Sequence, residues 1–455
     1  MKPLELKYIA EAVNGTLVGP NAVVSGIVCD SRKVEPGALF VALRGRRTDG
    51  HEHISAAVEN GAVAALVERG GPYHCSYIIV DDGVAAIGEL AKVHLMRHPT
   101  KVVAITGSMG KTSTKEMAAA ALRQRFSVFK SVGNLNTEIG LPISVLHHTD
   151  EKVMVLEMAM RGPGQIAELS RIAPADVAVI TNIGESHLGI MGTRGAIAAA
   201  KGEILSNMKL GGAAVLNRDD DYYEYLAPLA QGPVTSFGYH ADADYRIAEV
   251  RTLDGGHYRC KVVTGTESHW LRAPWPGLHN INNAVAALVV AGVMGVGLTE
   301  AIAGIEACPP TPGRLRVMHL PLGVTLIDDT YNASPAATMS ALSTLAEIPT
   351  LGRRIAVLGD MLELGSREAQ AHAEVAEKAA EVCHLVITVG KLASKIADYC
   401  EQQGLPVHRF SDHAGVADVL QREMENGDVI LIKGSRSIQL ETVVSALVEA
   451  GRQQE

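Results

Sequence analysis

Cysteine is scarce and scattered in this sequence. Its six cysteines lie far apart, and no two of them form a Cys-x-x-Cys pair. A structural zinc site or a disulfide framework would need cysteines at short, regular spacings. We therefore expect neither, and a reducing compartment fits this pattern best. The six are Cys29, Cys75, Cys260, Cys308, Cys383 and Cys400.

Long hydrophobic runs are also missing. The most apolar long stretch, from Ala284 to Leu298, is interrupted by Gly292, Gly295 and Gly297. It is too short to span a bilayer comfortably, so it is predicted to be a buried helix. The N-terminal residues lack the long apolar core of a signal peptide. We expect a cytoplasmic protein without a membrane span.

Blocks of like charge are absent as well. The formal net charge is −9, and acidic and basic residues are mixed along the chain. Basic clusters would be needed to bind nucleic acid or an anionic membrane. We expect no nucleic-acid partner and a small substrate. Because no coiled-coil heptad is present, we expect a monomer.

The length of the chain indicates several domains. Its 455 residues provide for about three domains of ~150 residues each. A helical pattern from Ala85 to Arg97 stops at Pro99, and the stretch "CPPTPGR", from Cys308 to Arg314, is typical of a linker. We expect domains at 1–98, 99–312 and 313–455.

The order of apolar runs predicts an α/β protein. Short strand-like runs alternate with helical patterns in a small N-terminal domain. From Lys101 the alternation predicts parallel βαβ units in a central P-loop-type domain. Between Val234 and Trp275, two alternating runs joined by Asp254-Gly255-Gly256 predict an antiparallel annex. The last part is predicted to be Rossmann-like, although the Gly-x-Gly-x-x-Gly fingerprint is absent.

The stretch "VVAITGSMGKT", from Val102 to Thr112, predicts a phosphate-binding loop. It ends in Gly-Lys-Thr, but its first glycine, Gly107, comes later than in a standard P-loop. Backbone N–H groups at the start of the following helix attract phosphate oxygens. Lys111 would approach the β- and γ-phosphates, and the Thr112 hydroxyl would bind Mg²⁺. The alternative is an ordinary glycine turn.

Three more residues lie near predicted strand ends or in a neighbouring helix. Glu157 follows "VMVL" and could complete a magnesium site, or it could cap the surface. His187 is as compatible with a structural role as with a ligand role. Lys201 lies in the alanine-rich stretch "AIAAAKGEI", which by itself predicts a solvated lysine.

Four further residues allow two interpretations each. Asn283, in "GLHNINNA", could be a helix cap. Asp329 precedes "TYNASP" and could form a turn or contact a ligand. Lys433 and Arg436, in "LIKGSRS", follow a buried-type strand and form either an anion site or a surface turn.

Taken together, these motifs resemble the Mur ligases, the ATP-dependent amide-forming enzymes of peptidoglycan precursor synthesis. The resemblance covers nearly the whole chain, and this family has the short phosphate loop. The combination of "NLNTEIG", "DDTYNASP", "LGDMLELG" and "IKGSR" resembles the branch that adds D-alanyl-D-alanine. Other matching motifs are "DSRKVEPGALFVAL", "RTDGH" (Arg47 to His51), "ESHL", "AKGEI", "GLHNINNA" and "PGRL".

The resemblance implies roles for individual residues. ATP and two Mg²⁺ ions would bind in the central domain, with Thr112 and Glu157 on one ion and His187 and a carbamylated Lys201 on the other. Lys111, Lys201 and His187 would be catalytic. The implied nucleotide-binding residues are Gly107, Ser108, Gly110, Lys111, Thr112, Ser113, Asn283 (at adenine), Arg314 and Asp329, and the implied substrate-binding residues are Ser31 and Arg32 (near uridine), Asn136, Lys433 and Arg436.

The resemblance also implies a reaction. The terminal carboxylate of UDP-N-acetylmuramoyl-tripeptide would be phosphorylated by ATP, and the amine of D-alanyl-D-alanine would attack the acyl phosphate. The alternatives are a Mur-type ligase that adds a single amino acid, a folylpolyglutamate synthase-like ligase, and an NTP-dependent regulatory module. The sequence departs from the family pattern at Ala159, where glycine is usual, and at Gly189, where glutamate is common.

Overall fold

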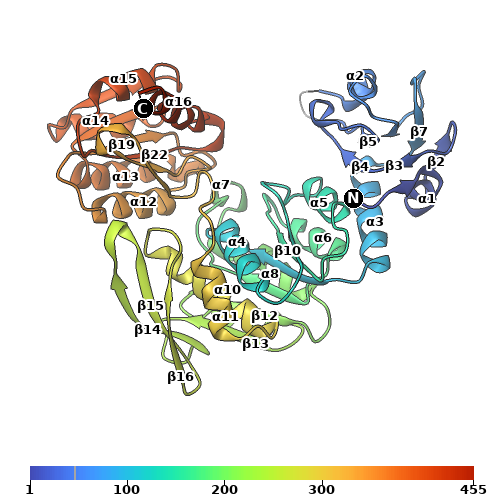
Figure 1. Ribbon diagram of the computed structural model, residues 1–455, viewed down its shortest axis with the longest axis horizontal. Helices are drawn as coiled ribbons and strands as arrows, with labels where there is room; N and C mark the ends of the chain where they lie inside the picture. Colours follow the sequence, from blue (N-terminus) through green and yellow to red (C-terminus); the bar gives the residue numbers. More distant parts are fainter. Residues whose placement is uncertain (46–47, 455) are drawn as a thin grey trace.

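A computed structural model describes residues 1–45 and 48–454. Each of three consecutive parts of the chain contains its own main sheet. Figure 1 shows the N-terminal and C-terminal parts on opposite sides of the central part. Within the described residues, no helix combines the length and apolar character needed to cross a membrane. This arrangement confirms the expected three-domain α/β architecture.

The N-terminal domain contains a five-stranded sheet in the order β2-β7-β6-β5-β4. Its strands β4 to β7 are parallel and β2 is antiparallel to β7, while β1 and β3 form a separate antiparallel pair. The elements are β1 (Leu4–Glu5), α1 (Leu6–Ala12), β2 (Thr16–Val18), β3 (Val23–Val24), β4 (Gly26–Val28), η1 (Ser31–Lys33), β5 (Ala38–Val41), η2 (Gly50–His53), α2 (Ile54–Glu59), β6 (Ala64–Val67), β7 (Ser76–Ile79) and α3 (Gly83–Arg97).

Helix α3 joins the N-terminal domain to the central domain, because it packs against α5 (Gly140–Leu146). Near its C-terminal end, His94 is only 4% exposed. The His94 ring centroid lies 4.7 Å from that of His98 and 5.8 Å from that of His148. Burial, together with the neighbouring His98 and His148, lowers the pKa of His94 to about 4.

The burial of His94 predicts that the folded protein is less stable in acid. The ordinary histidine pKa is 6.5, so between about pH 6.5 and 4 the unfolded chain binds a proton that folded His94 does not. The free energy of unfolding should therefore fall as the pH falls through this window. Urea denaturation at pH 7 and pH 5 should show a smaller loss in His94→Phe than in the wild type. Exposed His53→Gln should keep the wild-type loss, and an equal loss in His94→Phe would contradict the assignment.

The central domain contains a nine-stranded sheet in the order β16-β15-β14-β13-β12-β11-β8-β10-β9. All neighbouring pairs from β9 to β14 in this order are parallel, and the pairs β14-β15 and β15-β16 are antiparallel. Its elements are β8 (Lys101–Thr106), α4 (Lys111–Leu122), β9 (Val128–Lys130), α5, β10 (Val153–Glu157), α6 (Gln165–Ile172), β11 (Val177–Ile180), α7 (Leu188–Met191), α8 (Arg194–Ser206), β12 (Ala213–Asn217), α9 (Tyr223–Leu226), η3 (Ala227–Leu229), β13 (Val234–Gly238), β14 (Tyr245–Thr252), η4 (Asp254–Gly256), β15 (Tyr258–Thr264), β16 (Glu267–Arg272), α10 (His279–Val293) and α11 (Leu298–Glu306).

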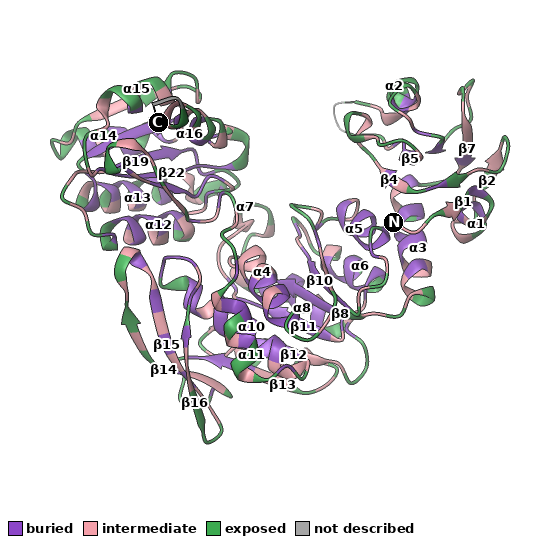
Figure 2. Cartoon of the chain, viewed as in Figure 1, coloured by how far each residue is buried: buried purple, intermediate pink, exposed green. Residues whose placement is uncertain are grey.

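The register of the central strands brings their carboxyl ends together. Glu157 of β10 lies opposite Ile105 of β8, and Ile180 of β11 lies opposite Thr106. Both faces of the sheet are buried, since alternate side chains of β8 belong to two different apolar clusters. Figure 2 shows these strands as buried and the ends of the annex strands as largely exposed. The loops after β8, β10 and β11 therefore meet at one edge, where ligands bind in such sheets.

The C-terminal domain contains a six-stranded sheet in the order β17-β18-β22-β19-β20-β21. The strands are parallel except for β17 at the edge. The predicted linker, 308–314, contains no helix or strand among its described residues. The elements are β17 (Arg316–His319), η5 (Pro321–Gly323), β18 (Thr325–Asp328), α12 (Pro335–Glu347), β19 (Arg354–Gly359), η6 (Gly365–Arg367), α13 (Glu368–Val382), β20 (Leu385–Val389), α14 (Ser394–Gln402), β21 (Val407–Phe410), α15 (Val416–Glu423), β22 (Val429–Lys433), η7 (Arg436–Ile438) and α16 (Glu441–Gln454).

Candidate active site

A cleft of about 1370 Å³ opens between the central and C-terminal domains. It exceeds the roughly 300–1,000 Å³ of a typical small-molecule pocket, so it has room for two reactants. The described residues that line it come from both domains. Among those predicted from the sequence, the lining includes Ser108, Gly110, Lys111, Thr112, Ser113, Asn136, Glu157, His187, Asn283, Arg314, Asp329, Lys433 and Arg436.

The phosphate loop runs from β8 into α4. Gly107 and Gly110 have φ values of 148° and 79°, and α4 begins at Lys111. Asn182, just after β11, holds the loop through both its backbone and its side chain. Its carbonyl accepts from Ser108 N at 2.9 Å, its Oδ1 accepts from Met109 N at 3.0 Å, and its Nδ2 donates to Met109 O at 3.1 Å. The loop is therefore preorganised by the neighbouring strand end.

A substitution at Gly110 tests the shape of this loop. The glycine is left-handed, and an added Cβ would collide with the Asn283 Oδ1 atom. Gly110→Ala should cost about 1–2 kcal/mol of stability from the backbone conformation alone, and should also weaken ATP binding because the loop must shift. Gly211→Ala is a matched control, since its φ is 76° and its Cβ would meet nothing within 4 Å. Calorimetric ATP affinity equal to wild type in Gly110→Ala would contradict this geometry.

Two lysines converge beneath the loop. Lys111 Nζ donates to Gly107 O at 2.7 Å, and Lys201 Nζ donates to the same carbonyl at 3.0 Å. Lys201 lies in α8 and is only 2% exposed, so the solvated position expected from its alanine-rich surroundings is wrong. Burial lowers the pKa of Lys201 well below its ordinary value, and the charge of Lys111 adds to the shift. The neutral, nucleophilic amine is therefore more readily formed at this position than in a lysine exposed to water.

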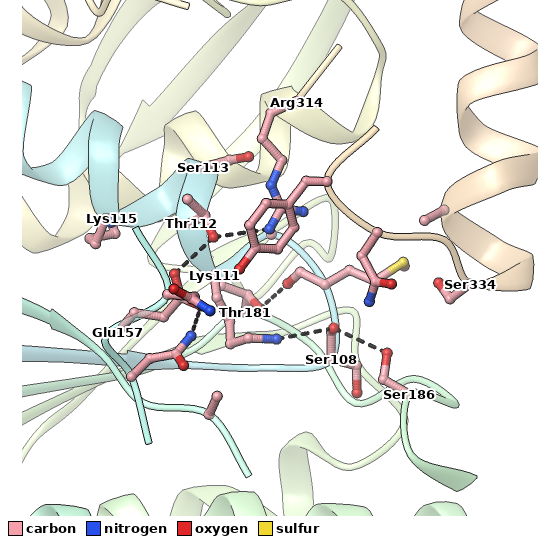
Figure 3. A pocket seen from close by; sticks show the side chains of 18 of the residues that line it. Ser108, Lys111, Thr112, Ser113, Lys115, Glu157, Thr181, Ser186, Arg314 and Ser334 are labelled. Carbon is pink, nitrogen blue, oxygen red and sulfur yellow. Dashed lines mark hydrogen bonds between the residues drawn. The ribbon is translucent and has the colours of Figure 1, made fainter. Parts of the chain in front are cut away.

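Thr112 and Glu157 bring together the oxygen atoms of a candidate cation site. The Thr112 hydroxyl donates to Glu157 Oε2 at 2.8 Å, and Asn136 Nδ2 donates to Glu157 Oε1 at 2.8 Å. Arg314 of the linker donates to Thr112 Oγ1 at 3.2 Å. Figure 3 shows Thr112 between Glu157 and Arg314. The site thus combines residues from α4, β10 and the linker.

These donors fit Mg²⁺ only with help from a bound ligand. Within the described residues, no group of three or more His, Cys, Asp or Glu side chains could hold a metal ion by itself. The predicted set contains one carboxylate, Glu157, and one imidazole, His187. Magnesium commonly binds through one or two carboxylates plus substrate phosphates. The residues present fit a nucleotide-bridged magnesium site.

His187 lies in the loop between β11 and α7. Its backbone is left-handed, with φ at 65°, and its Nδ1 atom lies 2.9 Å from Glu363 Oε2 of the C-terminal domain. Burial lowers the pKa of His187, while the Glu363 carboxylate opposes this shift. Positive charge on Lys111 and Lys201 also lowers the pKa of His187, because it disfavours a second positive charge on the ring.

The C-terminal wall of the cleft contains an ion pair. Lys433 Nζ, buried at the end of β22, pairs with Asp329 Oδ2 and donates to Asn332 O at 2.9 Å. Asp329 Oδ1 accepts from the backbone N of Leu315 at 3.3 Å, so it also holds the chain directly after the linker. Arg436 is exposed and pairs with Glu441 at 3.0 Å.

Asn283 lies beneath the phosphate loop in α10. Its Oδ1 accepts from Thr114 Oγ1 at 3.4 Å, and its Nδ2 donates to Asn280 Oδ1 at 2.9 Å. It is the fifth residue of α10, which begins at His279, so it does not cap that helix. The side chain therefore connects α10 to α4 at the base of the cleft.

Four predicted residues do not line the cleft. Gly107 and Lys201 lie beneath its floor, in contact with each other. Ser31 and Arg32 lie in η1 of the N-terminal domain, where Arg32 donates to both Asp30 carboxylate oxygens at 2.9 Å. The motif residue Arg47 lies outside the described residues.

Three residues that shape the site are not among those predicted from the sequence. Asn182 holds the phosphate loop, the centroid of the Tyr331 ring lies 3.9 Å from the Arg314 guanidinium carbon, and Glu363 contacts His187. Asn182 lies inside the apolar run predicted as a strand, 176–184, but the strand β11 ends at Ile180, so Asn182 follows its carboxyl end as a polar residue. Tyr331 and Glu363 belong to quoted motifs, but only the folded chain brings them to their partners.

Family models match most of the chain. The Mur ligase middle domain matches residues 105–291, the Mur ligase glutamate ligase domain matches 313–436, and the Mur ligase family catalytic domain matches 23–123.

Individual proteins match the chain over nearly its full length. A Bacillus subtilis protein named UDP-N-acetylmuramoyl-tripeptide–D-alanyl-D-alanine ligase is 37% identical, with 98% of each chain covered. A crystal structure of MurF from Acinetobacter baumannii is 30% identical, with a TM-score of 0.89 and 99% of each chain covered. MurF from Thermotoga maritima in complex with ADP is 32% identical, with a TM-score of 0.81 and coverage of 95% of this chain and 99% of that one.

Proposed function

This chain belongs to the Mur ligase family, and from that premise we propose how its cleft forms a peptide bond. It is an ATP-dependent ligase that adds D-alanyl-D-alanine to UDP-N-acetylmuramoyl-tripeptide in peptidoglycan synthesis. The observation that carries the mechanism is the phosphate loop, where Lys111 begins a helix and Thr112 contacts Glu157.

The terminal carboxylate of the tripeptide is a poor electrophile, so it must first be activated. An oxygen of the tripeptide carboxylate attacks the γ-phosphorus of ATP, the bond to the bridging oxygen breaks, and ADP leaves. The amine of D-alanyl-D-alanine then attacks the acyl carbon, inorganic phosphate leaves with the former carboxylate oxygen, and the nitrogen loses a proton. Positioning and charge stabilisation provide most of the catalysis in such transfers.

We assign the charges around the phosphates as follows. Lys111 and the N–H groups at the start of α4 bind the β- and γ-phosphates. Thr112 and Glu157 would hold one Mg²⁺, and His187 with a carbamylated Lys201 would hold the second. When bound, these ions neutralise charge on the transferring phosphoryl group. The lowered pKa of Lys201 supports the carbamate, because carbon dioxide reacts with a neutral amine.

The remaining assignments concern the nucleotide and the peptide substrate. Asn283 would approach adenine, and Arg314 and Asp329 would contact the nucleotide from the C-terminal side. Asn136, Lys433 and Arg436 would contact the peptide substrate, and Ser31 and Arg32 the uridine part, from the N-terminal domain. We further propose a monomer that acts in the cytoplasm, where ATP is available.

Closure of the last domain would exclude water from the acyl phosphate. The cleft is lined by the central and C-terminal domains, so rotation between them would change access to it. Small-angle scattering with and without an ATP analogue and precursor should show a more compact particle when these ligands are bound. An unchanged envelope would count against closure.

Phosphate release distinguishes the proposed ligase from the alternatives. With ATP present, precursor and D-alanyl-D-alanine are varied independently, and single amino acids and folate substrates are offered in parallel. The ligase should release stoichiometric phosphate only when both its co-substrates are present. Release that ignores D-alanyl-D-alanine would favour a regulatory NTPase, and release with a single amino acid would favour another ligase of this family.

A further inference from the structure

Two short segments beside the cleft form one of the contacts between the central and C-terminal domains. Residues 185–189 precede and begin α7, and residues 363–367 connect β19 to α13. Helix α7 packs against η6 of the second segment, and Figure 1 places α7 next to the C-terminal domain. Two ion pairs cross this junction, His187 with Glu363 and Glu185 with Arg367.

A close approach of two backbones brings these pairs together. A Cβ added at Gly189 would lie 2.8 Å from Gly365 N and 3.0 Å from Glu363 O. Only glycine at position 189 leaves room for the second segment to dock at this distance. Glu363 itself has a φ of 64°, which is unusual for a residue with a side chain. Strained backbone at a contact surface is commonly associated with function.

The contact between His187 and Glu363 has a chemical consequence for the imidazole ring. A carboxylate can only accept hydrogen bonds, so at 2.9 Å the Nδ1 atom carries the proton and donates it to Glu363. The Nε2 atom is then the nitrogen with a free lone pair. Histidine ligands in metal sites are commonly held this way by a carboxylate on the other ring nitrogen.

We propose that Glu363 is a positioning residue that orients His187 for the second cation, and that it does so only when the C-terminal domain is docked through Gly189 and Gly365. The inference rests on the proposed function, since it assumes a cation at His187. Docking of the C-terminal domain thereby raises the affinity of the second cation site. The first site, at Thr112 and Glu157, contains no residue of this junction and is independent of it.

Manganese binding tests this proposal without relying on turnover. The wild-type protein is saturated with a non-hydrolysable ATP analogue, and bound Mn²⁺ is counted by electron paramagnetic resonance. Glu363→Ala and Gly189→Ala should each weaken the second Mn²⁺ by about 10–100-fold and leave the first within about twofold. Glu363→Gln should retain most of the second-site affinity, because its amide oxygen accepts the same hydrogen bond.

Two matched controls separate the effect from general damage. Gly195→Ala adds the same methyl group where the nearest atom would be 3.8 Å away, and Glu377→Ala removes an exposed acid from α13. Both should bind two Mn²⁺ ions like the wild type. The proposal would be overturned if the wild type bound a single Mn²⁺, if both test variants kept the wild-type affinity for the second Mn²⁺, or if both sites were weakened equally. Ligation by the wild-type protein is measured separately, so a protein that ligates normally but gives any of these results leaves the proposed function standing.

Discussion

Lys111→Ala should abolish most ligation, with a turnover rate lower by on the order of 10²–10³-fold. Lys111 is the first residue of α4, directly after the phosphate loop. Its Nζ atom donates to the carbonyls of Gly107 and Ser108 at 2.7 and 3.3 Å. In the proposed mechanism it lies next to the γ-phosphate, where negative charge must be stabilised during transfer. Steady-state phosphate release with both co-substrates measures the loss.

Stability provides the control for this variant. The side chain is only half-buried, and its lost hydrogen bonds should cost about 1 kcal/mol, so the protein should remain folded by circular dichroism. Lys152→Ala removes an exposed lysine from the same domain and should keep wild-type turnover. A folded Lys111→Ala protein with undiminished turnover would refute the role of the loop.

Lys201→Met should lower turnover by on the order of 10²-fold, because methionine fills the same buried space but cannot form a carbamate. Lys201 is 2% exposed, and its pKa is lowered by burial and by Lys111. The neutral amine would attack carbon dioxide and release one proton. Carbon-13 spectra with labelled bicarbonate should show a carbamate resonance in the wild type that is absent from the variant.

Chemical rescue separates a lost ligand from a damaged core. Lys201→Ala leaves a cavity beneath Gly107, and a short carboxylate such as propionate could occupy it and replace the carbamate oxygens. Added propionate should restore part of the turnover of Lys201→Ala, whereas Lys201→Met, with no cavity, should not respond. A wild type without the carbon-13 resonance, together with full activity in Lys201→Met, would contradict the carbamate.

The sequence predicted the strands and helices that have buried, regular apolar patterns. Strand β8 and helix α4 were predicted because a continuous apolar run precedes a glycine turn and an alanine-rich stretch. Strands β16, β17 and β21 were not predicted. They lie at the edges of their sheets, with several polar and partly exposed side chains, so no apolar run marks them.

Residues of the candidate site were predictable where a side chain of suitable chemistry lies near the carboxyl end of a strand. Thr112 and Glu157 follow that rule, and parallel register brings them together. The burial of Lys201 arises from its contact with Gly107, 94 residues earlier, and no local pattern encodes it. Likewise, Glu363 meets His187 across a separation of 176 residues. Such contacts depend on tertiary packing, within the central domain for Lys201 and between two domains for Glu363.

Oxygen transfer from the substrate tests acyl phosphate formation most directly. The precursor is prepared with oxygen-18 in the terminal carboxylate of its peptide, and ligation is run with ATP and D-alanyl-D-alanine in unlabelled water. If the carboxylate attacks the γ-phosphorus, mass spectrometry will find one labelled oxygen in each phosphate released with the peptide product. Unlabelled phosphate accompanying the same product would mean that the carboxylate is never phosphorylated.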